Sequence, residues 1–195
     1  MAALRTGKAA AREAGSPTLL AHAMGEQAYA LLDLGRPTDA LDLICAARAA
    51  TGTSLPSLLA CWLTAAEAEL AAAAGDADAS RRSFDLADRA LPADCADPGL
   101  PYLLLGPAHL TRWRGSALAR LGDADATEHL YSALDGMGAT RTLRAQAGLR
   151  VDLVAALTAA GDVDQATTEA TTAGDLATRA GSMRLRRRLD QLTAA

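Results

Sequence analysis

Aromatic side chains are scarce in this sequence. They make up 3% of the 195 residues, whereas hydrophobic residues make up 50%. β-Sheets depend on β-branched and aromatic side chains, and such residues never alternate here over a useful length. Alanine and leucine must therefore supply the packing, so the composition excludes a β-rich fold and predicts an all-α protein.

Long uncharged hydrophobic runs are also missing. The richest stretch, residues 55–74, is interrupted by Glu67 and Glu69, so it falls short of the roughly 18 uncharged apolar residues that a membrane span requires. The N-terminal stretch MAALRTGKAAAREAG has no apolar core of the kind found in secretory signals. We therefore expect a cytoplasmic protein without a membrane partner.

Cysteine and excess positive charge are scarce as well. Cys45, Cys61 and Cys95 form no close pair and no metal-binding spacing, so we expect free buried thiols instead of a disulfide framework. The formal net charge is −4, whereas nucleic-acid binding requires a basic stripe. The one basic cluster, residues 184–188, is typical of a solvated helix face. Direct nucleic-acid binding by this chain is not expected.

The sequence holds no constellation typical of catalysis or of metal binding. His22 is separated from His109 and His129 by whole repeats, and the pair Glu128–His129 lacks the second ligand pair of a zinc-protease helix. We therefore expect no enzyme, no cofactor and no metal.

What the sequence does contain is a repeated pattern of Gly, a short polar turn and an Ala-bearing amphipathic stretch. The repeat glycines are Gly35, Gly75, Gly122 and Gly161, with spacings of 40, 47 and 39 residues. The next residue is suited to cap the following helix in three cases: Asp76, Asp123 and Asp162. Glycine ends a helix in the left-handed conformation without penalty. This period is typical of helical-repeat proteins, whose units stack to bury their apolar faces.

The positions before each repeat glycine predict the buried face of the first helix in each unit. Positions 12, 7, 4 and 1 before the glycine are never polar, and steps of 5, 3 and 3 keep them on one side of a helix. The second helices carry alanines seven residues apart in three units, whereas the second unit has Ala79 and Ala87. The three regular pairs are Ala40 and Ala47, Ala126 and Ala133, and Ala166 and Ala173. Such alanines permit close helix approach.

The glycines and prolines between the predicted helices indicate a single helical-repeat domain over residues 1–195. Its parts are a lone N-terminal helix (1–14), four helical hairpins (17–51, 53–91, 100–138 and 139–181), a Pro-rich inter-repeat loop (92–101) and a closing helix (182–195). Gly15, Ser16 and Pro17 supply a stop, a cap and a first-turn proline. We expect a right-handed α-solenoid whose arginine-rich closing helix provides the polar outer face that terminal repeats need.

Three stretches carry a family resemblance. They are AHAMGEQAYALLDLGRPTDALDLICAAR (21–48), AHLTRWRGSALARLGDADATEHL (108–130) and LRVDLVAALTAAGDVDQATTEA (149–170). The pattern resembles tetratricopeptide-type repeats and, more narrowly, the C-terminal repeat region of actinobacterial transcription regulators that carry an N-terminal helix-turn-helix; it covers residues 17–192. The resemblance implies a regulatory sensor that binds an effector or a partner and dimerises. Residues 1–14 are too short to hold a DNA-reading domain.

A stripe of polar and aromatic residues lies opposite the predicted core on the first helices, and it holds both tryptophans. Trp, Tyr and Arg are enriched at binding hot spots. In tetratricopeptide-like folds the first helices line a concave groove, so the resemblance places this stripe at the ligand surface. The candidate site residues are His22, Glu26, Tyr29, Trp62, Glu69, His109, Arg112, Trp113, Ser116 and Asp152.

Two functions remain open at this point. The first is a binding module that takes a peptide, a protein or a small effector in a groove running from His22 to Asp152. The second is a structural homo-oligomer, for example a homodimer, in which the Ala-rich ends of the copies pair without a small ligand. The tryptophans also have two interpretations: Trp62 and Trp113 either face the groove, where truncation would spare folding, or pack between neighbouring first helices and hold them together.

Overall fold

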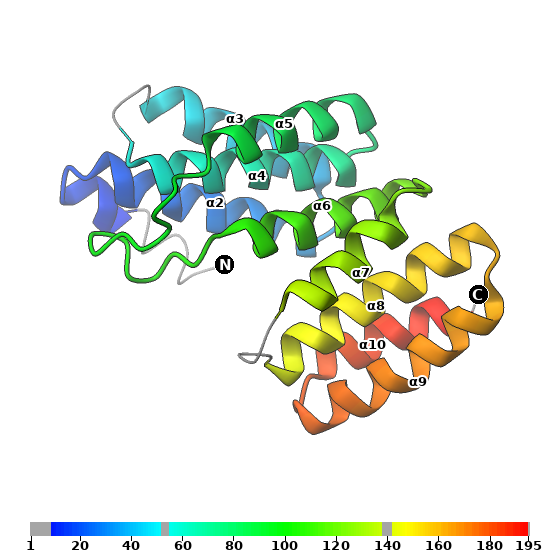
Figure 1. Cartoon of the computed structure of the whole chain (residues 1–195). Coiled ribbons are helices and arrows are strands. Elements are labelled where there is room, and N and C mark those ends of the chain that lie inside the picture. Colours follow the sequence, from blue (N-terminus) through cyan, green and yellow to red (C-terminus); the bar gives the residue numbers. More distant parts are fainter. Residues whose placement is uncertain (1–8, 52–54, 138–141, 195) are drawn as a thin grey trace. The chain divides into compact units, whose positions relative to one another are not determined.

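A computed structural model of the chain describes residues 9–51, 55–137 and 142–194 (Figure 1). All the secondary-structure elements within these ranges are helices, and the ranges contain no strand, so the all-α prediction is confirmed. None of the helices in the described part of the chain is long and apolar enough to cross a membrane. Residues 9–13 are helical, whereas residues 1–8 of the predicted first helix and the predicted hairpin limits at 53, 138 and 139 lie outside the described residues.

The chain divides into two compact units, Met1–Leu110 (unit 1) and Thr111–Ala195 (unit 2), and each is described by itself. The helices of unit 1 are α2 (Pro17–Asp33), α3 (Pro37–Thr51), α4 (Ser57–Ala73) and α5 (Ala77–Ala90). Helix α2 packs on α3 and α4 packs on α5, while α3 and α2 both contact α4. These four helices therefore form two helical hairpins in unit 1.

Unit 2 is built around α8. Helix α6 (Pro107–Leu121) begins in unit 1 and continues into unit 2, where it is followed by α7 (Ala126–Gly136), α8 (Leu143–Ala160), α9 (Val163–Arg179) and α10 (Met183–Thr193). Helix α8 packs against α7 and α9, and α10 packs on both α8 and α9. Leu118 of α6, Leu130 of α7 and Leu153 of α8 share one buried apolar cluster. The predicted closing helix is present as α10.

The repeat glycines end helices as predicted. All four have positive φ, from +69° to +86°, which favours glycine. Asp76 and Asp162 cap the following helices through their side chains. The expectation for Asp123 is wrong, because α7 begins only at Ala126 and the Asp123 carboxylate instead accepts a hydrogen bond from the backbone N–H of Asp125 at 3.0 Å.

The predicted core face is correct except at its last position. The residues seven and four before each repeat glycine are buried or half-buried. The residue directly before the glycine is exposed in three units, since Leu34 is 60% exposed and Ala74 and Ala160 are also exposed, whereas Leu121 is half-buried. The chain leaves the helix at this residue, so its side chain has no neighbouring helix to pack on.

The alanines of the second helices are buried as predicted, and the irregular second unit has a simple explanation. Ala79 is only half-buried, whereas Ser80 and Ala87, seven residues apart, are both buried. A small serine therefore takes the place that alanine holds in the other units, because close helix approach requires only a small side chain there.

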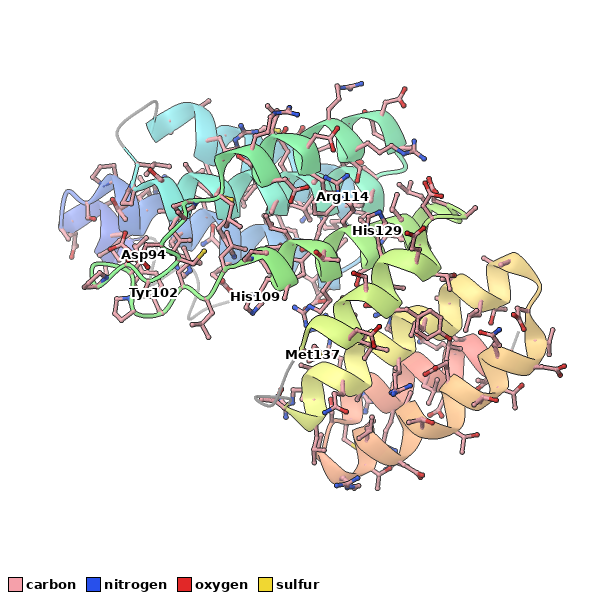
Figure 2. All side chains as sticks on the ribbon, viewed as in Figure 1. Asp94, Tyr102, His109, Arg114, His129 and Met137 are labelled. Atoms are coloured by element: carbon pink, nitrogen blue, oxygen red, sulfur yellow. The ribbon has the colours of Figure 1, made fainter. Side chains whose placement is uncertain are left out.

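The inter-repeat loop is longer than predicted. Residues 91–106 contain no helix, and the third hairpin begins at Pro107 instead of at residue 100. Leu100, Leu103 and Leu105 are buried although they lie in the loop, and Tyr102 is carried on the same segment (Figure 2). These leucines anchor the loop to the core.

Candidate functional site

In unit 1, helices α2 and α4 bring several predicted site residues together. The ring centroid of Trp62 lies 5.3 Å from that of His22 and 6.1 Å from that of Tyr29. The Tyr29 hydroxyl donates a hydrogen bond to the Glu69 carboxylate. Tyr102 from the inter-repeat loop approaches His22, with ring centroids 4.6 Å apart. Sequence reasoning missed Tyr102, because it lies outside the helical periodicity.

Trp62 does not face an open groove. It is 5% exposed, and its ring lies against Gly25 of α2, where an added Cβ atom would come within 2.4 Å of Trp62 Cζ3. The expectation of an exposed Trp62 is therefore wrong, and the alternative of a tryptophan packed between neighbouring first helices is correct. The helical periodicity of α4 alone cannot show that a glycine on α2, Gly25, leaves space for the Trp62 ring.

The His22 imidazole is held toward its neutral form. Burial lowers the pKa of His22 below its ordinary value, and the Glu26 carboxylate, 3.7 Å from His22 Nε2, opposes this effect. Glu26 itself is exposed, and so is His109 on the first turn of α6 (Figure 2). The aromatic cluster of unit 1 is thus a packed contact between helices and not a cleft.

The cysteines differ in burial from the prediction. Cys61 is buried, and its thiol lies 3.2 Å from the carbonyl oxygen of Ala87. Burial, followed by the nearby Asp88 and Cys95, raises the pKa of the Cys61 thiol to about 11, so it is a poor nucleophile. Cys45 is exposed and Cys95 is half-buried, so the expectation of a buried thiol is wrong for Cys45.

In unit 2, helices α6 and α8 bring Ser116 and Asp152 together. The Ser116 hydroxyl donates a hydrogen bond to Asp152, and a guanidinium nitrogen of Arg188 on α10 lies 2.6 Å from Asp152 Oδ1. Asp152 is 7% exposed, so its predicted place on an open stripe is wrong. Helix α10 lies outside the repeat pattern and covers this part of α8. Residues 184–188 of α10 were expected to form a solvated face, but Arg188 contacts Asp152 instead.

A cleft with a volume of ≈ 560 Å³ opens next to this contact. Its lining comes from Arg112 on α6, from the first two turns of α8, and from the turn and the N-terminal half of α10. Arg112 belongs to the predicted site, whereas Trp113, one residue further on, is half-buried and does not line the cleft. Sequence reasoning missed the residues of α8 and α10 that line the cleft, because they share no periodic pattern along the chain.

The charged side chains that line the cleft are all basic. Its lining includes four arginines from three helices: Arg112, Arg144, Arg184 and Arg188. No Asp or Glu is among the described residues that line it. The helices α8 and α10 both begin at the cleft, and a helix N-terminus carries a partial positive charge and unpaired backbone N–H groups. This arrangement is suited to binding anions.

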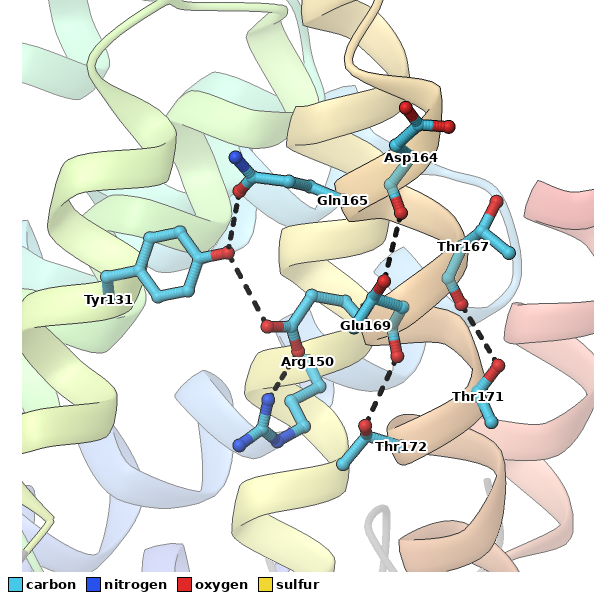
Figure 3. Close-up of polar contacts among 9 residues, drawn as sticks. Tyr131, Arg150, Asp164, Gln165, Thr167, Glu169, Thr171 and Thr172 are labelled. Carbon is cyan, nitrogen blue, oxygen red and sulfur yellow. Dashed lines mark hydrogen bonds and ion pairs between the residues drawn. The ribbon is translucent and has the colours of Figure 1, made fainter.

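A second polar network in unit 2 is structural. Arg150 of α8 forms an ion pair with Glu169 of α9, and the Tyr131 hydroxyl of α7 lies 3.5 Å from Glu169 and 3.3 Å from Gln165 (Figure 3). Burial, and then the Glu169 carboxylate, raises the pKa of Tyr131. The network joins three packed helices.

Comparison with known proteins assigns no family. No protein-family model matches the chain, and no significant match was found among curated proteins or solved structures. Among the residues that the structure describes, no group of His, Cys, Asp and Glu is arranged to hold a metal ion. Function must therefore be inferred from the geometry of the chain itself.

Proposed function

We propose that this chain is a helical-repeat binding module and that the arginine-lined cleft of unit 2 is its ligand site. The cleft volume of ≈ 560 Å³ carries this proposal, because pockets for small organic ligands typically measure about 300–1,000 Å³. The lining also has the mixed character of such pockets, since apolar Ala145 and Leu185 lie among the arginines.

We further propose that the hairpins belong to a right-handed α-solenoid of the tetratricopeptide type, as the sequence resemblance implies. The packing of α2 on α3, of α4 on α5 and of α8 on α9 supports this architecture. In that setting the module acts in the cytoplasm as a regulatory sensor or interaction domain, and occupation of the cleft is its input.

The cleft is a better candidate than the part of the predicted groove that falls in unit 1. A hot-spot residue must be accessible to its partner, and Trp62 is already buried against α2. Of the predicted site residues, Arg112 lines the cleft, while Ser116 and Asp152 hold the adjoining Arg188 in place. The predicted site and the cleft therefore share Arg112, and they adjoin at the ion pair between Asp152 and Arg188.

The proposal can be tested by screening ¹⁵N-labelled protein by NMR against a library of neutral, cationic and anionic small molecules. Ligands of the cleft should shift the backbone amide signals of Gly148 and Met183. The variant Gly148→Phe should block them, because a side chain at Gly148 points toward open space, with Leu185 4.0 Å away as the nearest neighbour.

Gly136→Phe is the matched control. Gly136 lies in the same unit at the end of α7, an added Cβ atom there meets nothing within 4 Å, and the residue does not line the cleft. This variant should bind like the parent protein. The proposal would be refuted if no compound shifted the cleft amides, or if Gly148→Phe left binding unchanged.

A further inference from the structure

Helix α10 begins at the cleft without a side-chain cap. Its N-cap residue, Ser182, has the extended backbone of a capping residue (φ −94°, ψ 90°), yet its hydroxyl makes no capping hydrogen bond. The other hydroxyl N-cap at the cleft, Thr142 of α8, does accept the backbone N–H of Ala145, at 3.2 Å. The first N–H groups of α10 have no acceptor within the helix.

Ser182 is also buried, at 8% exposure, and it belongs to the lining of the cleft. No hydrogen bond to its hydroxyl is found within residues 9–51, 55–137 and 142–194. The Ser182 hydroxyl oxygen is not one of the fully buried polar atoms that lack a partner among the described residues, so it is accessible although the residue as a whole is buried. A ligand in the cleft can therefore accept hydrogen bonds from this hydroxyl and from the adjacent backbone N–H groups.

The arginines around Ser182 indicate the charge of that ligand. Arg188 is neutralised by Asp152. Arg112 and Arg144 have no carboxylate partner among the described residues, although they converge on the same cleft. Like charges repel each other unless an anion lies between them, and the two helix N-termini add to the same positive field.

Building on the proposed binding function, we propose that the cleft binds a small organic molecule through a dianionic phosphate group. A single carboxylate is satisfied by one bidentate arginine. Two unpaired arginines, a free hydroxyl and the first-turn N–H groups of α10 can instead serve the three terminal oxygens of a phosphate monoester. The volume of ≈ 560 Å³ leaves room for an organic body beside the phosphate, against Ala145 and Leu185.

The test compares probes that share one aromatic body. Phenyl phosphate carries the dianionic group, whereas benzoate carries one carboxylate on the same ring. At low ionic strength and pH 7.5, NMR titration should show shifts of the Met183, Arg184 and Leu185 amides, with phenyl phosphate binding at least about tenfold more tightly than benzoate, because charge-assisted hydrogen bonds are the strong ones. Inorganic phosphate should compete with phenyl phosphate at the same amides.

Two arginine variants distinguish binding in the cleft from a general effect of the protein's net charge on anion affinity. Arg144→Gln removes one cleft guanidinium and should weaken phenyl phosphate binding by about tenfold. Arg186→Gln removes the same charge from an exposed residue of α10 that does not line the cleft. It should change the affinity by less than about twofold, because solvent and salt screen exposed charges.

Ser182→Asp separates binding from folding. A carboxylate at the N-cap can accept hydrogen bonds from the first-turn N–H groups of α10, and it interacts favourably with the helix dipole. The melting temperature should therefore stay the same or rise. The same carboxylate repels an incoming phosphate and occupies its donors, so phenyl phosphate binding should disappear.

Several results would overturn the phosphate assignment: equal affinity for phenyl phosphate and benzoate, an unchanged affinity in Arg144→Gln, or retained binding in a folded Ser182→Asp. If neutral or cationic compounds shifted the cleft amides and phenyl phosphate did not, the phosphate assignment would fail while the proposed binding function stood. If no compound shifted them, both would fail.

Discussion

The same position of the repeat is filled in unit 1 and empty in unit 2. The residue thirteen before the repeat glycine is Trp62 in α4 and Gly148 in α8, the sixth residue of each helix. Trp62 is buried against α2, whereas Gly148 lines the cleft beneath the N-terminus of α10. A helical repeat can therefore close its first-helix surface with one large side chain, or leave a binding cleft by omitting that side chain.

The two units also join their first helices differently. In unit 1 the contact is aromatic, with the Trp62 ring at Gly25 and a hydrogen bond from Tyr29 to Glu69. In unit 2 the contact is polar, since Ser116 donates to Asp152 and α10 contributes Arg188. The extra helix thus adds Arg184 and Arg188 to a cleft that Arg112 and Arg144 of the repeat helices also line.

The largest expected effect concerns the side chain that fills unit 1. Trp62→Ala should lower the free energy of unfolding by about 3–5 kcal/mol, because it empties a fully packed site. Trp113→Ala, at a half-buried position of α6, should cost only about 1–2 kcal/mol. Urea unfolding followed by circular dichroism measures both. A Trp62→Ala variant as stable as Trp113→Ala would contradict the close packing of Trp62 between α2 and α4.

A smaller effect, of opposite sign in the two units, is expected from adding one methyl group. Gly25→Ala places a Cβ atom 2.4 Å from Trp62 Cζ3 and should cost about 1–3 kcal/mol through overpacking. Gly148→Ala meets nothing closer than 4.0 Å and should stabilise α8 by about 0.5–1 kcal/mol. Thermal unfolding compares the two, and the cost of Gly25→Ala should vanish in a Trp62→Ala background. Equal changes in both units would contradict the comparison.

The smallest effect concerns the pH dependence of unit 1. Burial lowers the pKa of His22 below 6.5 and Glu26 raises it, so NMR titration should give a value below 6.5, and Glu26→Gln should lower it further. The unfolded chain then binds a proton at a higher pH than the folded chain. The stability that His22 contributes is therefore present above pH 6.5 and falls as the pH drops through 6.5 toward the folded pKa. A His22 pKa above 6.5 would contradict this expectation, because it would mean that the Glu26 carboxylate outweighs burial.

Local sequence signals predicted most of the fold. The repeat glycines end their helices, Asp76 and Asp162 cap the next ones, and the paired alanines are buried. Prediction was wrong where distant packing decides the outcome, as at residue 100, where buried leucines belong to a loop and not to a helix.

The candidate site was predicted less well than the fold. Arg112 was identified, but the partners that give it a role come from the starts of α8 and α10, more than thirty residues further along the chain. Asp152 and Trp62 were placed on an open surface and are buried. The angle around one helix axis states which residues share a face, and it does not state whether another helix covers that face.

The sequence alone determined the helical class, the helix ends at the repeat glycines and the small residues at helix crossings, because these depend on backbone conformation and on the 3.6-residue period of one helix. Only the tertiary structure decided that Trp62 is enclosed, that Asp152 holds Arg188, and that Ser182 and the arginines share one cleft. These features arise from side chains on different helices, and the distances between them are set by packing that no local pattern records.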